Sequence, residues 1–107
     1  MSLDIWLTKT MPTAVFDANI THNLGRMAEE AGIYDHLWHP ARVGVTKAEQ
    51  LIDPLQKALT AMYADPARFK AFDAGNGWGT YEQFLPWLQR LQTACMEHPD
   101  AEVGVSI

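Results

Sequence analysis

The order of apolar and polar residues changes period twice along the chain, from two to about 3.6 and back to two. Near the start, Leu3, Ile5 and Leu7 fall on one face at a period of two, which is typical of a strand. Pro12 interrupts this pattern, because proline cannot donate a hydrogen bond to a sheet. Residues 13–17 alternate again at hairpin distance, so they predict a second strand.

The end of the chain returns to alternation. Val103, Val105 and Ile107 fall on one side of a predicted strand over residues 101–107. An isolated hairpin is only marginally stable in water. We therefore expect this strand to join the N-terminal pair in a three-stranded, mainly antiparallel sheet.

Between the strands, apolar residues recur at steps of three and four, which predicts helices. The first helix follows a capping residue, Asn19 or Thr21, and ends before Gly32, a residue type suited to the position after a helix. Gly25 lies inside it, where glycine either permits close packing or marks an irregular first turn. Residues 33–44 then predict a short helical turn and a loop.

Residues 46–62 carry the clearest amphipathic stripe of the chain. It opens on Thr46 and Glu49, which have capping-box spacing. The stripe keeps its register across Pro54, so we expect one helix kinked there rather than a new helix capped by Asp53.

A short helix over residues 66–72 and a glycine-rich loop over residues 74–79 come next. Thr80 and Gln83 form a second capping box that opens the last helix. Pro86 is expected to bend the first turns of that helix. The element order is thus β-β-α-α-α-α-β, which predicts an α+β fold with helices packed on one face of the sheet.

Size and charge narrow the classes of function. The 107 residues predict a single α+β domain, 1–107, and the formal net charge is -5. The basic residues are scattered singly, so we expect binding neither to nucleic acid nor to anionic membranes. Cys95 is the only cysteine and the chain shows no secretory leader or long apolar run, which favours a cytoplasmic protein.

Residues 19–23 form the first candidate site, where the predicted strand turns into a helix. Polar side chains and free backbone N–H groups meet at such a helix start, which suits a ligand or partner. Asn19, Thr21, His22 and Asn23 are the candidate binding residues. The alternative is that Asn19 and Thr21 only cap the helix, and capping explains most of these residues unaided.

Residues 76–81 form the second candidate site. Glycines flank Trp78, so the backbone can adopt positive φ and present the indole as a binding anchor. Asn76 and Tyr81 complete this candidate set. The competing interpretation, favoured for a small domain with four tryptophans, is that Trp78 folds back into the core.

Metal and nucleophile chemistry have little support in the sequence. His36 and His39 are spaced for a helical face, and His22 is a third histidine for a metal site, but Pro40 disfavours helix at His39. Cys95 lies on an apolar helix face, where thiols are normally inert. We expect neither a metal site nor a cofactor, and the sequence carries no motif that identifies catalytic residues.

Four segments form a distinctive signature: Asn19-Ile20-Thr21-His22-Asn23-Leu24, Asp65-Pro66-x-x-Phe69, Asn76-Gly77-Trp78-Gly79-x-Tyr81 and Pro99-Asp100-Ala101. On these segments the chain resembles a group of small proteins from bacterial and phage or prophage genomes. The resemblance runs over nearly the whole chain from the second strand onward. The group has no assigned activity, cofactor or partner, so the resemblance implies none.

Two hypotheses of function follow. The first is a non-catalytic accessory protein that binds a protein partner, with self-pairing of an edge strand into a homodimer as a further possibility. The second is a small enzyme or ligand-binding domain with His22 as acid or base. The second hypothesis predicts that Asn19, His22 and Asn76 line one cavity.

Overall fold

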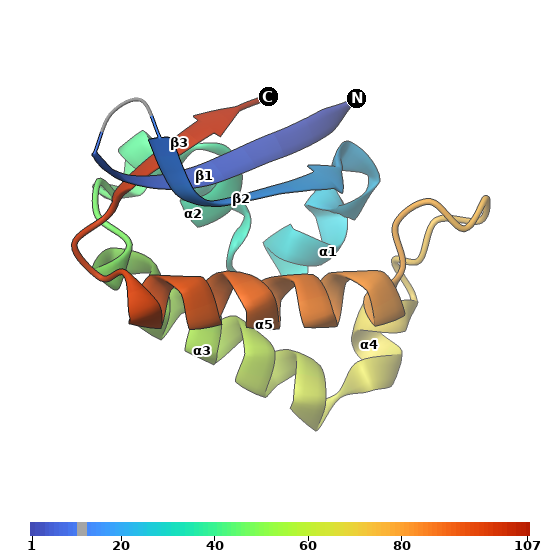
Figure 1. Ribbon diagram of the computed structural model, residues 1–107. Helices are drawn as coiled ribbons and strands as arrows, with labels where there is room; N and C mark the ends of the chain where they lie inside the picture. Colours follow the sequence, from blue (N-terminus) through green and yellow to red (C-terminus); the bar gives the residue numbers. More distant parts are fainter. Residues whose placement is uncertain (11–12) are drawn as a thin grey trace.

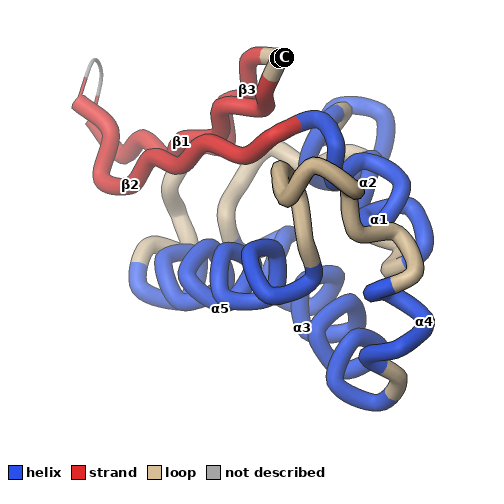
Figure 2. Tube along the Cα trace, turned by 90° about the vertical axis from the view of Figure 1, so that its right-hand side faces the viewer, coloured by secondary structure: helices blue, strands red, loops and turns tan. Residues whose placement is uncertain are grey.

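Three antiparallel strands form one layer of the structure and the helices form the other (Figures 1 and 2). The computed structural model describes residues 1–10 and 13–107. The sheet has the order β2-β1-β3, and its strands are β1 (Ser2–Thr10), β2 (Thr13–Thr21) and β3 (Glu102–Ser106). The predicted α+β fold, with the C-terminal strand beside the N-terminal pair, is therefore confirmed. The predicted interruption at Pro12 lies outside the described residues.

The central strand supplies the apolar floor of the sheet. Leu3, Ile5 and Leu7 are completely buried, as their alternation predicts. The helices all lie on this face of the sheet (Figure 2). They are α1 (Gly25–Glu30), α2 (Tyr34–Trp38), α3 (Glu49–Ala64), α4 (Pro66–Lys70) and α5 (Tyr81–Glu97). Because one face is covered, the core lies between the sheet and the helix layer.

β2 is longer than its predicted span of residues 13–17. Asn19 pairs with Asp4 and Ile20 with Leu3, so the strand continues to Thr21. The sequence interpretation of residues 19–21 as a loop is therefore wrong. These residues alternate, because Ile20 is buried while Asn19 is exposed on the other face.

The chain enters α1 through a tight first turn, the 3-10 helix His22–Leu24. The hydroxyl of Thr21 caps this turn by accepting a hydrogen bond of 3.2 Å from the backbone N–H of Asn23. A Cβ at Gly25 would lie 3.4 Å from Cε1 of Tyr34. This is an ordinary van der Waals distance, so of the two explanations offered for Gly25 the structure supports the irregular first turn and not a close approach that requires glycine.

α3 runs without a break through Pro54, as the continuous stripe predicts. Its predicted capping box is wrong, because Glu49 is the first residue of the helix and its side chain forms no cap. The Oε1 atom of Gln50 instead accepts from the backbone N–H groups of Thr46 and Lys47. The N–H of Glu49 is already bound to the Pro99 carbonyl, so the chain before β3 takes over part of the capping.

α5 begins at the second predicted capping box, which is confirmed. The Thr80 hydroxyl accepts from the backbone N–H of Gln83, and Oε1 of Gln83 accepts from the backbone N–H of Thr80. The helix continues through Pro86 and ends before His98. This cap fixes the point at which the glycine-rich loop enters the helix.

Candidate functional site

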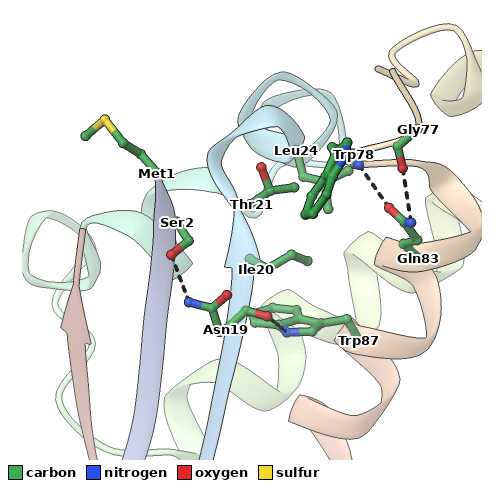
Figure 3. Close-up of a pocket in the computed structure, with 11 residues that line it drawn as sticks. Met1, Ser2, Asn19, Ile20, Thr21, Leu24, Gly77, Trp78, Gln83 and Trp87 are labelled. Atoms are coloured by element: carbon green, nitrogen blue, oxygen red, sulfur yellow. Dashed lines mark hydrogen bonds between the residues drawn. The ribbon is translucent and has the colours of Figure 1, made fainter. Parts of the chain in front are cut away.

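The two candidate segments meet in space. The side chain of Asn23, beyond the end of β2, donates a hydrogen bond of 2.8 Å from Nδ2 to the backbone carbonyl of Trp78. The two residues are 55 positions apart in sequence. The segment that leaves β2 and the glycine-rich loop therefore form one surface, at the end of the sheet near the start of α5 (Figure 3).

Gly79 makes this approach possible. Its φ is +110°, a conformation that residues with a side chain rarely adopt. A Cβ at this position would lie 3.1 Å from Cβ of Asn23, 3.2 Å from Cγ2 of Thr21 and 3.3 Å from Cγ of Leu24. The loop therefore packs against the first segment so closely that a side chain at residue 79 would have to displace its neighbours, in a backbone conformation that favours glycine.

Gln83 braces the loop from the other side. Its Oε1 atom accepts a hydrogen bond of 2.9 Å from the backbone N–H of Gly79. Its Nε2 atom donates a hydrogen bond of 3.2 Å to the carbonyl of Gly77 (Figure 3). The residue between them, Trp78, donates its own backbone N–H to Oδ1 of Asn76 at 3.0 Å. The backbone of residues 77–79 is thus fixed by three side chains.

Trp78 is 71% exposed although its backbone is fixed. The favoured sequence interpretation, in which Trp78 fills the core, is therefore wrong. Trp87 and Leu24, which line the same cavity as Trp78, are both buried. A large apolar side chain held outside the core leaves exposed surface that a partner can cover.

A first cavity of about 560 Å³ lies on one side of the indole, between the end of β2 and the start of α5. Trp87 reaches it from α5 and donates from Nε1 to the Asn19 carbonyl at 3.1 Å (Figure 3). Its volume is in the range of known ligand sites. The lining residues are Met1, Ser2, Asn19, Ile20, Thr21, Leu24, Gly77, Trp78, Gly79, Gln83 and Trp87.

A second cavity of about 590 Å³ shares Met1, Thr21 and Trp78 with the first. Its other lining residues are His22, Asn23 and Asn76. Because the two cavities share these walls, we treat them as one surface and call it the Trp78 groove.

His22 supplies the only titratable side chain among the lining residues of the groove. Its Nε2 atom is buried and has no hydrogen-bond partner among the described residues. Its ring meets the indole of Trp38 edge to face, with the centroids 6.2 Å apart. Because this atom has no surface open to solvent, it does not face the cavity, and other parts of the His22 ring form the wall.

Asn19, His22 and Asn76 do not line a single cavity. Asn19 lines the first, while His22 and Asn76 line the second. Nδ2 of Asn19 is also engaged, because it donates to the Ser2 hydroxyl at 2.9 Å and to Oδ1 of Asp4 at 2.7 Å. No carboxylate lines the groove within the described part of the chain, so the mapped walls hold no acidic group that orients His22 for proton transfer.

Tyr81 lies away from the groove. It is buried, and its hydroxyl donates a hydrogen bond of 2.9 Å to the carbonyl of Met62 in α3. Its backbone N–H donates a hydrogen bond of 2.7 Å to Oδ1 of Asp73. Tyr81 therefore positions the start of α5, and of the candidate residues it alone lines neither cavity.

Several groove residues were not among the sequence candidates: Ile20, Leu24, Gln83 and Trp87. The sequence identified Gln83 only as a capping residue. Its amide also holds the backbone of the glycine-rich loop, which depends on the loop conformation. Trp87 lies three residues after Phe84 and is buried, so helical spacing was a signal for its burial but not for its place in the groove.

His36 and His39 lie elsewhere, in and just after α2. Over residues 1–10 and 13–107, no three His, Cys, Asp or Glu side chains gather as metal ligands would. Among these same residues, none of the helices has the length and apolar character needed to cross a membrane.

The fold and the groove define an α+β protein with a ligand-sized surface cleft beside an exposed tryptophan. Comparison with family models, curated proteins and solved structures gave no match.

Proposed function

We propose that this chain is a non-catalytic binding protein that engages a protein partner through the Trp78 groove. The observation that carries the proposal is that both backbone polar groups of Trp78 are hydrogen-bonded while the residue as a whole is 71% exposed. Tryptophan is among the residues that contribute most to binding at protein interfaces.

The rigidity of the loop supports this function. Ordering a flexible side chain or loop on binding costs free energy, and a surface already held in place avoids much of that cost. Asn23, Asn76 and Gln83 hold the loop before any partner arrives. Four glycines of the chain have positive φ, and two of them, Gly77 and Gly79, flank Trp78.

The composition of the groove favours binding over catalysis. General acid–base and nucleophilic catalysis need a reactive group and a second group that orients or activates it. His22 lines the groove without a carboxylate, cysteine or lysine beside it among the mapped residues. Cys95 is buried in α5, and burial raises the pKa of its thiol to about 12, which opposes thiolate chemistry.

We also propose the kind of organism and the cell compartment in which the protein acts. The resemblance to small bacterial and phage or prophage proteins favours an accessory role in a bacterial or viral system. Cys95 is buried and unpaired, and a protein with this one cysteine needs no oxidising compartment to fold. We therefore place the protein in the cytoplasm.

Affinity capture from native lysate tests the proposal. We expect wild-type protein to retain a partner that Trp78→Ala loses. Tyr63→Ala is the matched control, because Tyr63 is an aromatic side chain exposed to 55% on α3, outside the groove. Loss of the same partner from both variants, or retention by both, would count against the proposal.

A further inference from the structure

We propose that the free edge of β2 adds an extended segment of another protein as a further strand, with a basic residue of that segment opposite Asp17 and an apolar residue beside Phe16. Asp17 and Phe16 line neither cavity of the Trp78 groove, so this is a second surface. The inference goes beyond the proposed function and does not depend on it. Its basis is the direction of the β2 backbone groups, a cavity beside Phe16 and the charge of Asp17.

The order β2-β1-β3 leaves β2 at an edge of the sheet. At the end of its ladder with β1, the N–H of His22 donates a hydrogen bond of 3.2 Å to the Met1 carbonyl. Residues that face the neighbouring strand alternate with residues that face away, so Asn19 and Asp17 direct their N–H and C=O groups away from β1. The Asn19 carbonyl confirms this direction, since it accepts from Nε1 of Trp87 in α5.

Three of these four outward backbone groups are free. The ladder does not use them, and no other hydrogen bond reaches the N–H or C=O of Asp17 or the N–H of Asn19 within residues 1–10 and 13–107. A row of unpaired backbone groups is a template for another strand, which donates and accepts in the same pattern. The β2 edge therefore fits an extended polypeptide.

The opposite edge of the sheet is covered where β3 begins. The N–H of Val103 faces outward there and donates a hydrogen bond of 2.9 Å to the Thr46 carbonyl. Lys47 forms an isolated bridge with Glu102 beside it. β2 is thus the more open of the two edges.

A cavity of about 380 Å³ lies between Phe16 and α5, which runs below β2 on the helix side of the sheet (Figures 1 and 2). Phe16 is only partly buried, and Pro86 and Ala94 add apolar surface. Side chains alternate between the faces of a strand, so a residue next to the one paired with Asp17 points to this side. An apolar residue at that position would cover Phe16. The other lining residues are Gln89, Arg90, Thr93 and Glu97, whose two charges are opposite.

Asp17 sets the chemistry on the outer face. It is exposed, it is the only charged residue of β2, and none of the ion pairs in the described part of the chain includes it. A residue paired with Asp17 on an added strand would have its Cβ about 5 Å away, where opposite charges stabilise the pair and like charges destabilise it. The edge therefore favours lysine or arginine at that position.

The same geometry opposes pairing of β2 with β2 of a second copy. A two-fold axis at Asp17 would set two carboxylates directly opposite each other. A register that pairs Asp17 with Asn19 of the other copy would use the Asn19 carbonyl, which Trp87 already occupies. A different protein is therefore the occupant that the edge selects.

Selection from a displayed library of random linear peptides tests the inference. Wild-type protein is the target, and binders that also bind Asp17→Pro are removed. Proline is tolerated where the N–H of an edge strand faces outward, so this variant keeps the ladder with β1 and loses one outward donor. We expect the remaining peptides to share a basic residue next to an apolar one. An acidic consensus, or no peptide that depends on residue 17, would overturn the inference.

Methylation of the backbone nitrogens of the selected peptide, one at a time, tests strand addition directly. Every second N–H of an added strand faces β2, so we expect binding to fall about tenfold or more at alternate residues only. On the protein side, the peptide is expected to slow hydrogen exchange at the Asp17 amide and to leave Ala18, which faces β1, unchanged. Losses without a period of two would overturn the inference. So would an Asp17 amide that exchanges slowly in the free protein, which would indicate pairing with a second copy.

A matched pair of variants tests the charge. We expect Asp17→Asn to bind the selected peptide about threefold more weakly than wild type, and Glu102→Gln, the same change of charge on β3, to bind it equally. Equal binding by Asp17→Asn would contradict the basic residue opposite Asp17. Trp78→Ala is expected to bind this peptide as wild type does, and loss of binding would overturn the separation of the two surfaces.

Discussion

Nδ2 of Asn23 lies 2.8 Å from the backbone carbonyl of Trp78, and this hydrogen bond joins the end of the sheet to the loop before α5. It connects the two segments on which the candidate site depends. The other side chains that hydrogen-bond to the loop backbone, Gln83 and Asn76, belong to the same local stretch of chain as the loop.

Replacement of Asn23 by alanine tests this connection. We expect Asn23→Ala to lower the free energy of unfolding by about 1 kcal/mol, since one hydrogen bond is lost. Urea unfolding measures this change. Capture of the partner is expected to weaken as well, because the Trp78 loop loses its long-range anchor. A variant with unchanged stability would show that this bond contributes little.

Two glycines of the loop allow a matched comparison. Both Gly77 and Gly79 have positive φ, but a Cβ at Gly77 would meet no atom within 4 Å, whereas one at Gly79 would press on three side chains. We expect Gly77→Ala to cost about 1 kcal/mol from backbone strain and Gly79→Ala about 3 kcal/mol. Thermal or urea unfolding compares them. Equal losses would contradict the close packing at Gly79.

Because the thiol of Cys95 is buried, we expect the free energy of unfolding to depend on pH. Burial raises the pKa of this thiol from its ordinary value of 9.0 to about 12. Below pH 9.0 both the folded and the unfolded state keep the proton, so the full contribution to stability is present. Between pH 9.0 and about 12 the unfolded state loses the proton first, so the free energy of unfolding falls as pH rises.

Cys95→Ala isolates the contribution of this thiol from every other effect of pH on stability. We expect the difference in free energy of unfolding between wild type and Cys95→Ala to shrink as pH rises through that window. A difference that stays constant from neutral pH upward would show that the thiol is not protected from deprotonation.

The outer face of the sheet gives a further prediction. The indole of Trp6 occupies the space that a Cβ on Gly104 would need. We expect Gly104→Ala to displace this indole, to change tryptophan fluorescence and to cost about 2 kcal/mol. Trp6→Leu is expected to relieve the conflict, so that the double variant loses less stability than the sum of the single variants. Additive losses would contradict the contact.

The fold was predictable because its determinants are local. The alternation at Leu3, Ile5 and Leu7 and the capping box of Thr80 and Gln83 act within a few residues, and both appear in the structure as expected. The box at Thr46 failed because it competes with a distant group, the Pro99 carbonyl, which accepts from the helix start. Spacing along the chain carries no sign of that contact.

The candidate site was predictable only in part. Asn23 and Trp78 were singled out from their loops, and the structure brings them together. Trp87 and Asn19, by contrast, are joined by a hydrogen bond although they are 68 positions apart in sequence. Helical periodicity predicts which residues of a helix are buried, but not which distant residue each one contacts. The polar run at residues 19–21 hid a strand, because its outward positions are polar and only Ile20 between them points inward.

The most direct test of the central claim is a cross-link from the position of Trp78 itself. A photoreactive benzoylphenylalanine placed at residue 78 is compared with the same group at Tyr63, an exposed position outside the groove. The account predicts one protein adduct from residue 78 that is absent from residue 63 and is suppressed by excess wild-type protein but not by Trp78→Ala. Identical adducts from both positions, or suppression by both competitors, would contradict it.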